Sequence, residues 1–329
     1  MSEHLPSVTL IIPARPEQAD IKAVNAARHL EYPTGQLEII VARGKHPSVQ
    51  RNAALQAARG EWIYFLDDDS VPPPQNLRHA AKHFSNPAVK MIGGPNLCPP
   101  AAPPLEQVFA VVLASWLAFG PSRARYACVG GVRATSEKEL ILCNLLARRA
   151  DLLELGGFNE ALYPNEENAL MDELQKRGGK LIYDPQLLVH RRPRHSLTAF
   201  FKMLRTYGRG RAEQFRVHPT LGSAANFVPP LFCLYLVTLA IFQITALGRP
   251  PGRLKILSAA PLALYAVAIL LQTLVSMPAS GVFRSLLAMP LLVASHIFYG
   301  FGFWRGLFTK LNRGLNRPRF EVVLEKIIR

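Results

Sequence analysis

The sequence predicts an α/β protein with a mostly parallel sheet, followed by helices that cross a membrane. Short apolar runs of strand length alternate with helical stretches in the N-terminal part. Three apolar segments, each about 20 residues long, occupy most of the chain after residue 227. With 49% apolar and 19% charged residues, the composition excludes a disordered or fibrous chain.

Three apolar runs have the length and composition of buried strands: Val8–Ala14, Leu37–Arg43 and Trp62–Leu66. The stretch between the second and third runs predicts a helix capped by Ser48 and ending near Ala58. Strands that alternate with helices predict a parallel sheet, and such sheets bind ligands at the carboxyl ends of their strands. Three stretches fall at those ends: Pro13, Arg43-Gly44 and Asp67–Asp69.

The three C-terminal apolar segments are Phe227–Leu247, Ile256–Met277 and Val282–Trp304. Each is long enough to cross a bilayer of about 30 Å, and core helices of soluble proteins are rarely apolar on all sides. Leu105–Gly120 is also apolar but is too short to span. We therefore expect residues 1–220 to form the α/β domain and residues 227–304 the membrane region.

The charge distribution predicts the orientation of these parts. The first 15 residues lack the basic-then-apolar layout of a signal peptide, so residues 1–220 are expected in the cytoplasm. The basic tail, residues 305–329, is expected there too. Three full spans would put the tail on the opposite side, so the number of transmembrane helices, two or three, stays open. The segment containing Arg284, or the one broken by Pro261, is the candidate for a re-entrant or interfacial piece.

The net charge of +15, from 38 basic and 23 acidic residues, favours anionic partners such as phosphate groups or a membrane surface. Residues 196–217 contain a basic amphipathic stretch suited to the headgroup plane, and a surface helix packed on the sheet is the alternative. Nucleic acid is not expected, because aromatic residues are not interleaved with the basic ones. The cysteines lack metal-binding spacing and predict buried, reduced thiols: Cys98, Cys128, Cys143 and Cys233.

The run Asp67-Asp68-Asp69 directly follows the predicted strand Trp62–Leu66. Adjacent carboxylates repel each other unless a cation or a hydrogen-bond donor compensates them. A hard divalent ion that also bridges phosphates fits such a position, and a solvated acidic turn before the prolines at 72–74 is the alternative.

Within residues 7–215 the chain carries an ordered set of motifs: IIPARPE (Ile11–Glu17), Arg51-Asn52, Asp67–Asp69, Asn144, Arg148-Arg149, GGFNE (Gly156–Glu160) and Glu166-Glu167. In this order they resemble the motifs of a family 2 nucleotide-sugar glycosyltransferase with the GT-A fold, which has a Rossmann-like sheet. It is closest to the membrane-attached branch that builds exopolysaccharide repeat units, including succinoglycan-type glucosyltransferases, where PNEEN (Pro164–Asn168) has a counterpart.

The resemblance implies roles for individual residues. Asp69, with Asp67 and His190, would hold Mg²⁺ or Mn²⁺, although a histidine at a strand end can equally be structural. Glu167 would deprotonate the acceptor hydroxyl, with Glu166 as the alternative; both can instead stabilise the start of a helix capped by Asn165. The donor would be bound by Pro13, Arg15, Glu17, Arg51, Asn52, Asp67, Asp68, Arg209 and Arg211, the last two of which are equally suited to lipid headgroups.

The implied activity is metal-dependent, inverting transfer of one sugar from a nucleotide-sugar, with a UDP-sugar expected, to a lipid-linked acceptor at the cytoplasmic face of the inner membrane. The chain departs from the family at Arg43–Ser48, where many members carry an Asp-Asp-Gly-Ser stretch that reads uracil. The Q-x-x-R-W motif of processive synthases is absent, so one sugar per encounter is expected. The alternatives are a polyprenyl-phosphate sugar synthase and a catalytically silent membrane scaffold.

Overall fold

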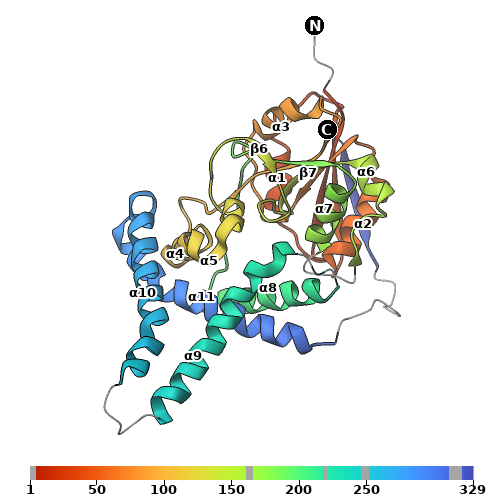
Figure 1. The fold of residues 1–329 in the computed structure, drawn as a ribbon. Helices are drawn as coiled ribbons and strands as arrows, with labels where there is room; N and C mark the ends of the chain where they lie inside the picture. The colour runs from red at the N-terminus through yellow and green to blue at the C-terminus, as the bar shows by residue number, and fades with distance from the viewer. Residues whose placement is uncertain are drawn as a thin grey trace. The chain divides into compact units, whose positions relative to one another are not determined.

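The computed structural model describes residues 5–160, 166–217, 219, 221–245, 252–310 and 321–328. The chain divides into two compact units (Figure 1). The first unit is α/β and comprises Met1–Pro100, Pro121–Arg192 and Asn312–Arg329. The second is helical and comprises Ala101–Gly120 and Pro193–Leu311. Three sequence predictions fall wholly or partly outside the described residues: the helix cap at Asn165, the start of the PNEEN stretch, and residues 311–320 and 329 of the basic tail.

The first unit is built on an eight-stranded sheet with the order β10-β2-β1-β3-β7-β4-β8-β6. Its strands are β1 (Val8–Ala14), β2 (Leu37–Arg43), β3 (Trp62–Leu66), β4 (Val89–Gly93), β6 (Arg133–Thr135), β7 (Asn144–Arg148), β8 (Lys180–Tyr183) and β10 (Val323–Ile328). The three strands predicted from sequence have the predicted bounds. β1 pairs in parallel with β2 and β3, and β4 with β8. Because β7 runs antiparallel between β3 and β4, and β6 and β10 are also antiparallel to their neighbours, the α/β sheet is mixed.

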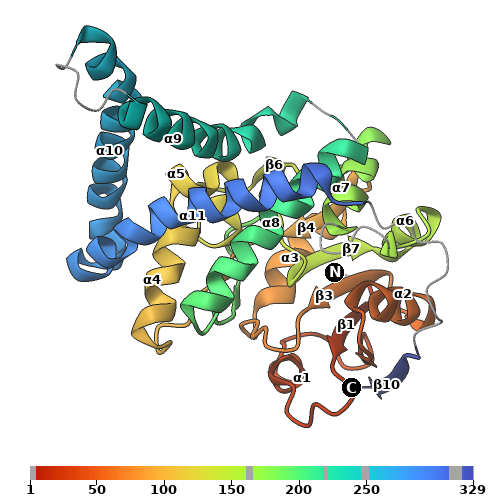
Figure 2. The ribbon, with the colours of Figure 1, turned by 90° about the horizontal axis from the view of Figure 1, so that it is seen from below.

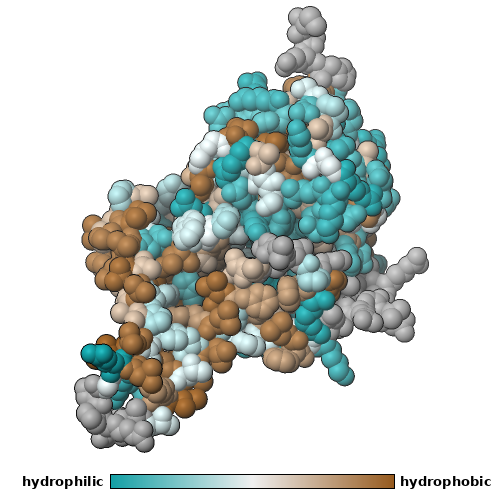
Figure 3. All heavy atoms as spheres, viewed as in Figure 1, coloured by the Kyte–Doolittle hydropathy of each residue, from teal (hydrophilic) through white to brown (hydrophobic). Residues whose placement is uncertain are grey.

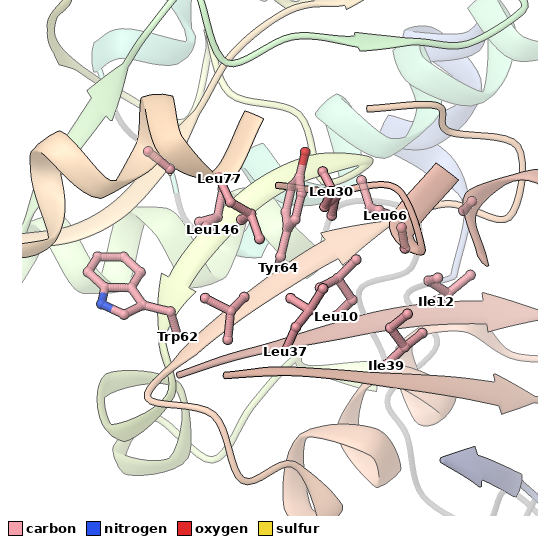
Figure 4. Packing of buried hydrophobic residues seen from close by; sticks show 14 of the residues in the cluster. Leu10, Ile12, Leu30, Leu37, Ile39, Trp62, Tyr64, Leu66, Leu77 and Leu146 are labelled. Atoms are coloured by element: carbon pink, nitrogen blue, oxygen red, sulfur yellow. The ribbon is translucent and has the colours of Figure 1, made fainter. Parts of the chain in front are cut away.

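Side chains of alternate residues in the central strands point to opposite faces of the sheet, and both faces are buried. Leu10 and Ile12 of β1 pack on one face with α1 (Lys22–Ala27) and α3 (Asn76–Phe84) (Figure 4). Ile11, between them, packs on the other face. That second face is covered by α2 (Pro47–Ala57), α6 (Arg149–Glu154) and α7 (Glu166–Lys176).

The start of α2 differs from the prediction. The helix begins at Pro47, whose fixed φ suits the first helical position, and the preceding His46 makes no side-chain cap. Ser48 lies inside the helix and is buried, so it is not the cap. Gln50 donates from Nε2 to the carbonyl oxygens of Ala14 (2.8 Å) and Ala42 (2.5 Å). This side chain therefore ties together the ends of β1 and β2, where the ligand site was expected.

The second unit contains the long apolar helices. Its elements are α4 (Pro104–Leu113), α5 (Trp116–Phe119), α8 (Leu197–Val217), the 3-10 turn Leu221–Phe227, α9 (Val228–Thr245), α10 (Arg253–Ser280) and α11 (Val282–Phe308). Three helices of the described residues are long and apolar enough to span a membrane: Ala224–Thr245, α10 and α11. Hydrophobic side chains cover much of the surface of this unit (Figure 3). The apolar stretch 105–120 forms a helix pair bent by 60°.

All four cysteines are free thiols, as predicted, but only Cys143 and Cys233 are buried. Cys128 is exposed and Cys98 is half-buried, so the expectation of four buried thiols is wrong for these two. Both lie in irregular connections between strands, where less of the chain packs around them.

Candidate active site

The three aspartates follow the last residue of β3, at the carboxyl end of a fully buried strand. The strand is apolar throughout, with Tyr64 and Phe65 among its buried side chains, and it ends where the chain reaches the edge of the core. The Asp67 and Asp69 side chains are partly exposed, at 23% and 41%. The sequence therefore placed these two carboxylates correctly at the edge of the sheet.

Five side chains at this edge form a chain of alternating charges. Arg51 of α2 contacts Glu166 of α7 (Nη1 to Oε1, 3.5 Å) and Asp67 (Nη2 to Oδ1, 2.9 Å). Arg191 contacts the other oxygen of Asp67 (Nη2 to Oδ2, 3.2 Å) and Asp69 (Nε to Oδ1, 2.5 Å). We call Glu166, Arg51, Asp67, Arg191 and Asp69 the charge chain. It links β3 to α2, to α7 and to the segment after β9 (Val189–His190).

A backbone bridge brings Arg191 to the aspartates. Val71 and His190 exchange two main-chain hydrogen bonds of 2.9 Å, although they are far apart in the sequence. Arg191 follows His190 directly and donates its own N–H to Leu97 (3.0 Å). Burial alone would lower the pKa of the Arg191 guanidinium. The negative charges of Asp67 and Asp69 outweigh this effect and hold the pKa above its ordinary value. Arg191 is therefore a permanent positive charge between two carboxylates.

Glu166 and Glu167 lie in the first turn of α7, as the sequence predicted for a helix in this region. Glu166 is buried, with 2% of its surface exposed, and Glu167 is half-buried. Burial, together with the charge of Glu167, raises the pKa of Glu166 to about 7, and the Arg51 guanidinium lowers it only in part. The two neighbouring glutamates therefore differ: one is enclosed and tied to Arg51, and the other is accessible.

The Gly156–Glu160 motif is held by Asn52. The Asn52 amide donates to the Phe158 carbonyl (2.9 Å) and to Glu160 Oε1 (2.9 Å), and it accepts from the Phe158 N–H (2.8 Å). Gly157 has φ +79°, and a Cβ there would lie 2.5 Å from Asn52 Oδ1. Both the donor and the acceptor group of the Asn52 amide, which was predicted to bind the donor, bind this loop.

The other predicted donor residues lie on β1, in the loops after β1 and β3, and on α8. Pro13 is buried within β1, whereas Arg15 and Glu17 are exposed in the loop after it. Asp68 is half-buried, and its carbonyl accepts from the Ala23 N–H (3.1 Å). Arg209 and Arg211 lie on α8 in the second unit, where Arg209 pairs with Glu213 (3.4 Å) and Arg211 with Gln214 (3.0 Å).

The residues available for a metal are two carboxylates that are already paired. The described residues contain no group of three or more His, Cys, Asp or Glu side chains that could hold a metal ion, so His190 does not join Asp67 and Asp69 in one. His190 Nδ1 is buried and finds no hydrogen-bond partner among those residues. One or two carboxylates that act together with substrate phosphates are nevertheless a common way to hold Mg²⁺. Asp67 and Asp69 fit that donor set.

Sequence comparison adds the family. Residues 22–100 match the model of glycosyl transferase family 2, and residues 62–303 match that of glycosyl transferase family group 2. The second match covers most of the chain. The chain belongs to glycosyl transferase family group 2. The resemblance inferred from the ordered motifs is thus confirmed for the family.

Among known members, the chain is similar to the pre-mycofactocin glycosyltransferase of Mycobacterium tuberculosis, with 26% identity over 178 residues. That match covers 53% of this chain and 36% of the relative, so the chain spans about a third of that protein's length. The fold resembles that of the mannosyltransferase PcManGT from Pyrobaculum calidifontis, solved with GDP-Man and Mn²⁺. The TM-score is 0.55, with 18% identity and 88% of each chain covered. This similarity supports the GT-A fold of the family member.

Two features of the site were not found from sequence. The sequence patterns assign no role to Arg191 or to Gln50. Arg191 depends on the bridge between Val71 and His190, which no local pattern indicates. Gln50 had a usable signal, because it is a polar residue on the face of α2 that turns toward the sheet.

Proposed function

We propose that the protein is a metal-dependent, inverting glycosyltransferase that moves one sugar from a nucleotide-sugar, with a UDP-sugar expected, to a lipid-linked acceptor in polysaccharide biosynthesis. The observation that carries this proposal is the charge chain at the carboxyl end of β3, in a member of this transferase family. It combines carboxylates suited to a divalent cation with guanidinium groups suited to phosphates.

Asp69 and Asp67 would hold Mg²⁺ or Mn²⁺, and a bound ion would neutralise charge on the leaving nucleoside diphosphate. Asp69 is the better placed of the two for a ligand, because it is more exposed and Asp67 contacts guanidinium groups through both oxygens. Mn²⁺ in the PcManGT structure is a property of that protein and supports the choice of probe here. His190 would join Asp67 and Asp69 as a ligand only if donor and ion binding brought it closer to them, because the described residues contain no three-ligand group.

Arg191 has a defined part in this proposal. Its guanidinium occupies one oxygen each of Asp67 and Asp69, so it competes with any cation for the same carboxylates. Guanidinium groups also bind diphosphates in a bidentate manner. Arg191 thereby keeps the adjacent aspartates neutralised before the donor arrives, and Arg51 does the same for Asp67 and Glu166.

We propose Glu167 as the base that removes the proton from the acceptor hydroxyl. It lies in the first turn of α7 and is partly accessible, whereas Glu166 is enclosed. A single base that activates the attacking hydroxyl leads to direct displacement and inversion at the anomeric carbon. Glu166, which is fixed by Arg51, would then position the start of α7 and remains the alternative base.

The base is tested by comparing Glu167→Gln with Glu166→Gln. We expect Glu167→Gln to bind the donor normally and to lower sugar transfer by about 10² to 10⁴. Transfer by Glu167→Gln at the wild-type rate would contradict the assignment, and loss only in Glu166→Gln would move the role to that residue. Mass spectrometry of the lipid product identifies the acceptor: an extended sugar on a diphosphate supports the proposal, and one sugar on a monophosphate indicates a polyprenyl-phosphate sugar synthase.

The proposed location is the inner membrane, with several crossings and with residues 1–220 facing the cytoplasm, where nucleotide-sugars are made available. Three helices with membrane-spanning length and composition support membrane association. A catalytically silent scaffold in the same membrane would need no metal carboxylates, so its function would survive Asp69→Ala.

A further inference from the structure

The C-terminal strand β10 lies in the same sheet as β1 and β2 (Figure 2). It pairs antiparallel with β2 over six residues, from Val323 opposite Arg43 to Ile328 opposite Glu38. Side chains reinforce the pairing: Arg43 contacts Glu325 (2.6 Å), and Lys326 donates to the Ala57 carbonyl (2.7 Å). All three candidate spans lie between β9 and β10 in the sequence. A chain that returns to one sheet has crossed the membrane an even number of times.

This parity excludes three complete spans, so at least one of the three helices does not cross. The same reasoning applies to the bent pair at Pro104–Arg125, because the chain enters it from β5 (Asn96–Leu97) and leaves it toward β6, both in the first unit. The bent pair therefore does not make a single crossing either. The remaining question is which of α9, α10 and α11 stays on the side of the sheet.

Helix α11 differs from the other two in its packing. In the most apolar 18-residue stretch of each helix, 39% of α11 is buried, against 11% of the α9 span and 6% of α10. It packs against α8 so closely that the backbones touch: a Cβ on Gly208 of α8 would overlap the Tyr299 carbonyl, and one on Gly302 of α11 would overlap the Arg205 carbonyl. Phe201 and Phe298 stack between the same helices at 4.3 Å.

Helix α8 is too highly charged to lie in hydrocarbon. Its charged residues are Lys202, Arg205, Arg209, Arg211, Glu213 and Arg216. Arg216 also donates to the carbonyl oxygens of Gly306 and Thr309 at the end of α11. The part of α11 from Phe298 onward is therefore held beside a polar helix. The rest, residues 282–297, spans only about 24 Å as a helix, short of a bilayer core of about 30 Å.

We infer that α9 and α10 cross the membrane as a hairpin, and that α11 lies with α8 in the lipid headgroup layer on the side of the catalytic sheet. The exposed apolar side chains of α9 and α10 then face lipid. The basic side chains of α8 lie where anionic headgroups gather. This inference does not depend on the proposed chemistry, since it follows from chain topology and packing alone.

Single cysteines in the full-length protein test this arrangement in cells. In a Cys98→Ser, Cys128→Ser background, which leaves the two buried thiols, one cysteine is placed at Gly252, Val282 or Phe308. All three positions are exposed, and a Cβ at Gly252 meets no atom within 4 Å. The exposed native Cys128, kept in a Cys98→Ser chain, reports the side of the catalytic sheet. Labelling with a membrane-impermeant maleimide is compared before and after permeabilisation of spheroplasts.

We expect the cysteine at 252 to label on the side opposite Cys128, and those at 282 and 308 to label on the same side as Cys128. If both ends of α11 label on one side of the membrane, α11 does not cross it. A cysteine at 282 and one at 308 on opposite sides would overturn the inference, because α11 would then span. A cysteine at 252 on the side of Cys128 would also overturn it, because α9 would then not cross.

Discussion

At the residue scale, the site is the charge chain, in which each charged side chain affects the pKa or the pairing of its neighbours. Glu166 shows this most clearly, because it is buried beside Glu167 and its contact with Arg51 is long, at 3.5 Å. Its pKa is raised to about 7, so the fold binds its proton more tightly than the unfolded chain does. As the pH rises from about 4.5 to about 7, the unfolded chain releases this proton first, and the protein loses stability.

We therefore predict that Glu166→Gln gains stability relative to the wild type as the pH rises. The shift between pH 4.5 and 8 corresponds to about 3 kcal/mol in the free energy of unfolding. The measurement is the thermal unfolding midpoint of both full-length proteins in detergent across this range. A difference in midpoint that stays constant with pH would show that the pKa of Glu166 is the same in the folded and the unfolded chain.

Arg191 carries the second prediction at this scale. It bridges Asp67 and Asp69, so its removal leaves two neighbouring carboxylates with less compensating charge. We expect Arg191→Gln to bind Mn²⁺ more tightly than the wild type in the absence of nucleotide, by about tenfold in Kd. Free Mn²⁺ is measured by electron paramagnetic resonance.

Arg177→Gln is the matched control for Arg191→Gln. Arg177 also bridges two carboxylates, Glu173 (3.1 Å) and Glu154 (3.0 Å), but on the exposed surface of the first unit. Its removal should leave Mn²⁺ binding unchanged. If Arg191→Gln binds Mn²⁺ no better than the wild type, Arg191 and the cation do not share the aspartates.

The sequence was sufficient to predict the position of residues that depend on a single strand or a single helix. Asp67 and Asp69 follow directly from the end of β3, and the glutamates follow from the start of α7. It was not sufficient for the contacts that Arg191 and Asn52 make. Both depend on contacts between segments about 100 residues apart, Arg191 with Asp69 and Asn52 with Phe158, which leave no local periodic signal.

At the element scale, the loop that carries the Gly-Gly-Phe-Asn-Glu motif depends on α2. Asn52 makes three hydrogen bonds to it, and Gly157 is the residue that lets the loop approach the Asn52 amide. We predict that Asn52→Ala lowers stability by about 2 kcal/mol, because each such bond contributes about 0.5 to 1.5 kcal/mol.

A structural role for Asn52 also predicts what should stay unchanged. Donor affinity of Asn52→Ala, measured by titration at a temperature where the variant is folded, should match that of the wild type. Gly157→Ala should lower stability in the same way, because its Cβ would collide with the amide and its φ is positive. A tenfold loss of donor affinity in Asn52→Ala without a loss of stability would return this residue to the donor site.

The elements themselves divide into predictable and unpredictable ones for a physical reason. Strands β1, β2 and β3 are buried on both faces, so each reads as a continuous apolar run with clear ends. Strand β10 has exposed and charged positions, because it lies at the edge of the sheet, and its sequence has no such run. The antiparallel insertion of β7 depends on pairing between distant segments.

At the scale of the whole molecule, family membership and the charge chain lead to one central claim. We propose that the chain transfers a sugar from a nucleotide-sugar and that this transfer depends on the carboxylates that follow β3. The most direct measurement is nucleotide release from UDP-, GDP- and dTDP-sugars by the detergent-solubilised full-length protein, with native lipid extract as acceptor. It is made with and without Mn²⁺, in the wild type and in Asp69→Ala.

The account predicts that one donor is turned over, that release requires Mn²⁺, and that Asp69→Ala lowers it by at least about 10². Asp172→Ala, which changes an aspartate paired on the surface of α7 with Lys176, should retain wild-type release. Release by Asp69→Ala at the wild-type rate, or failure of every donor to bind or react, would contradict the central claim.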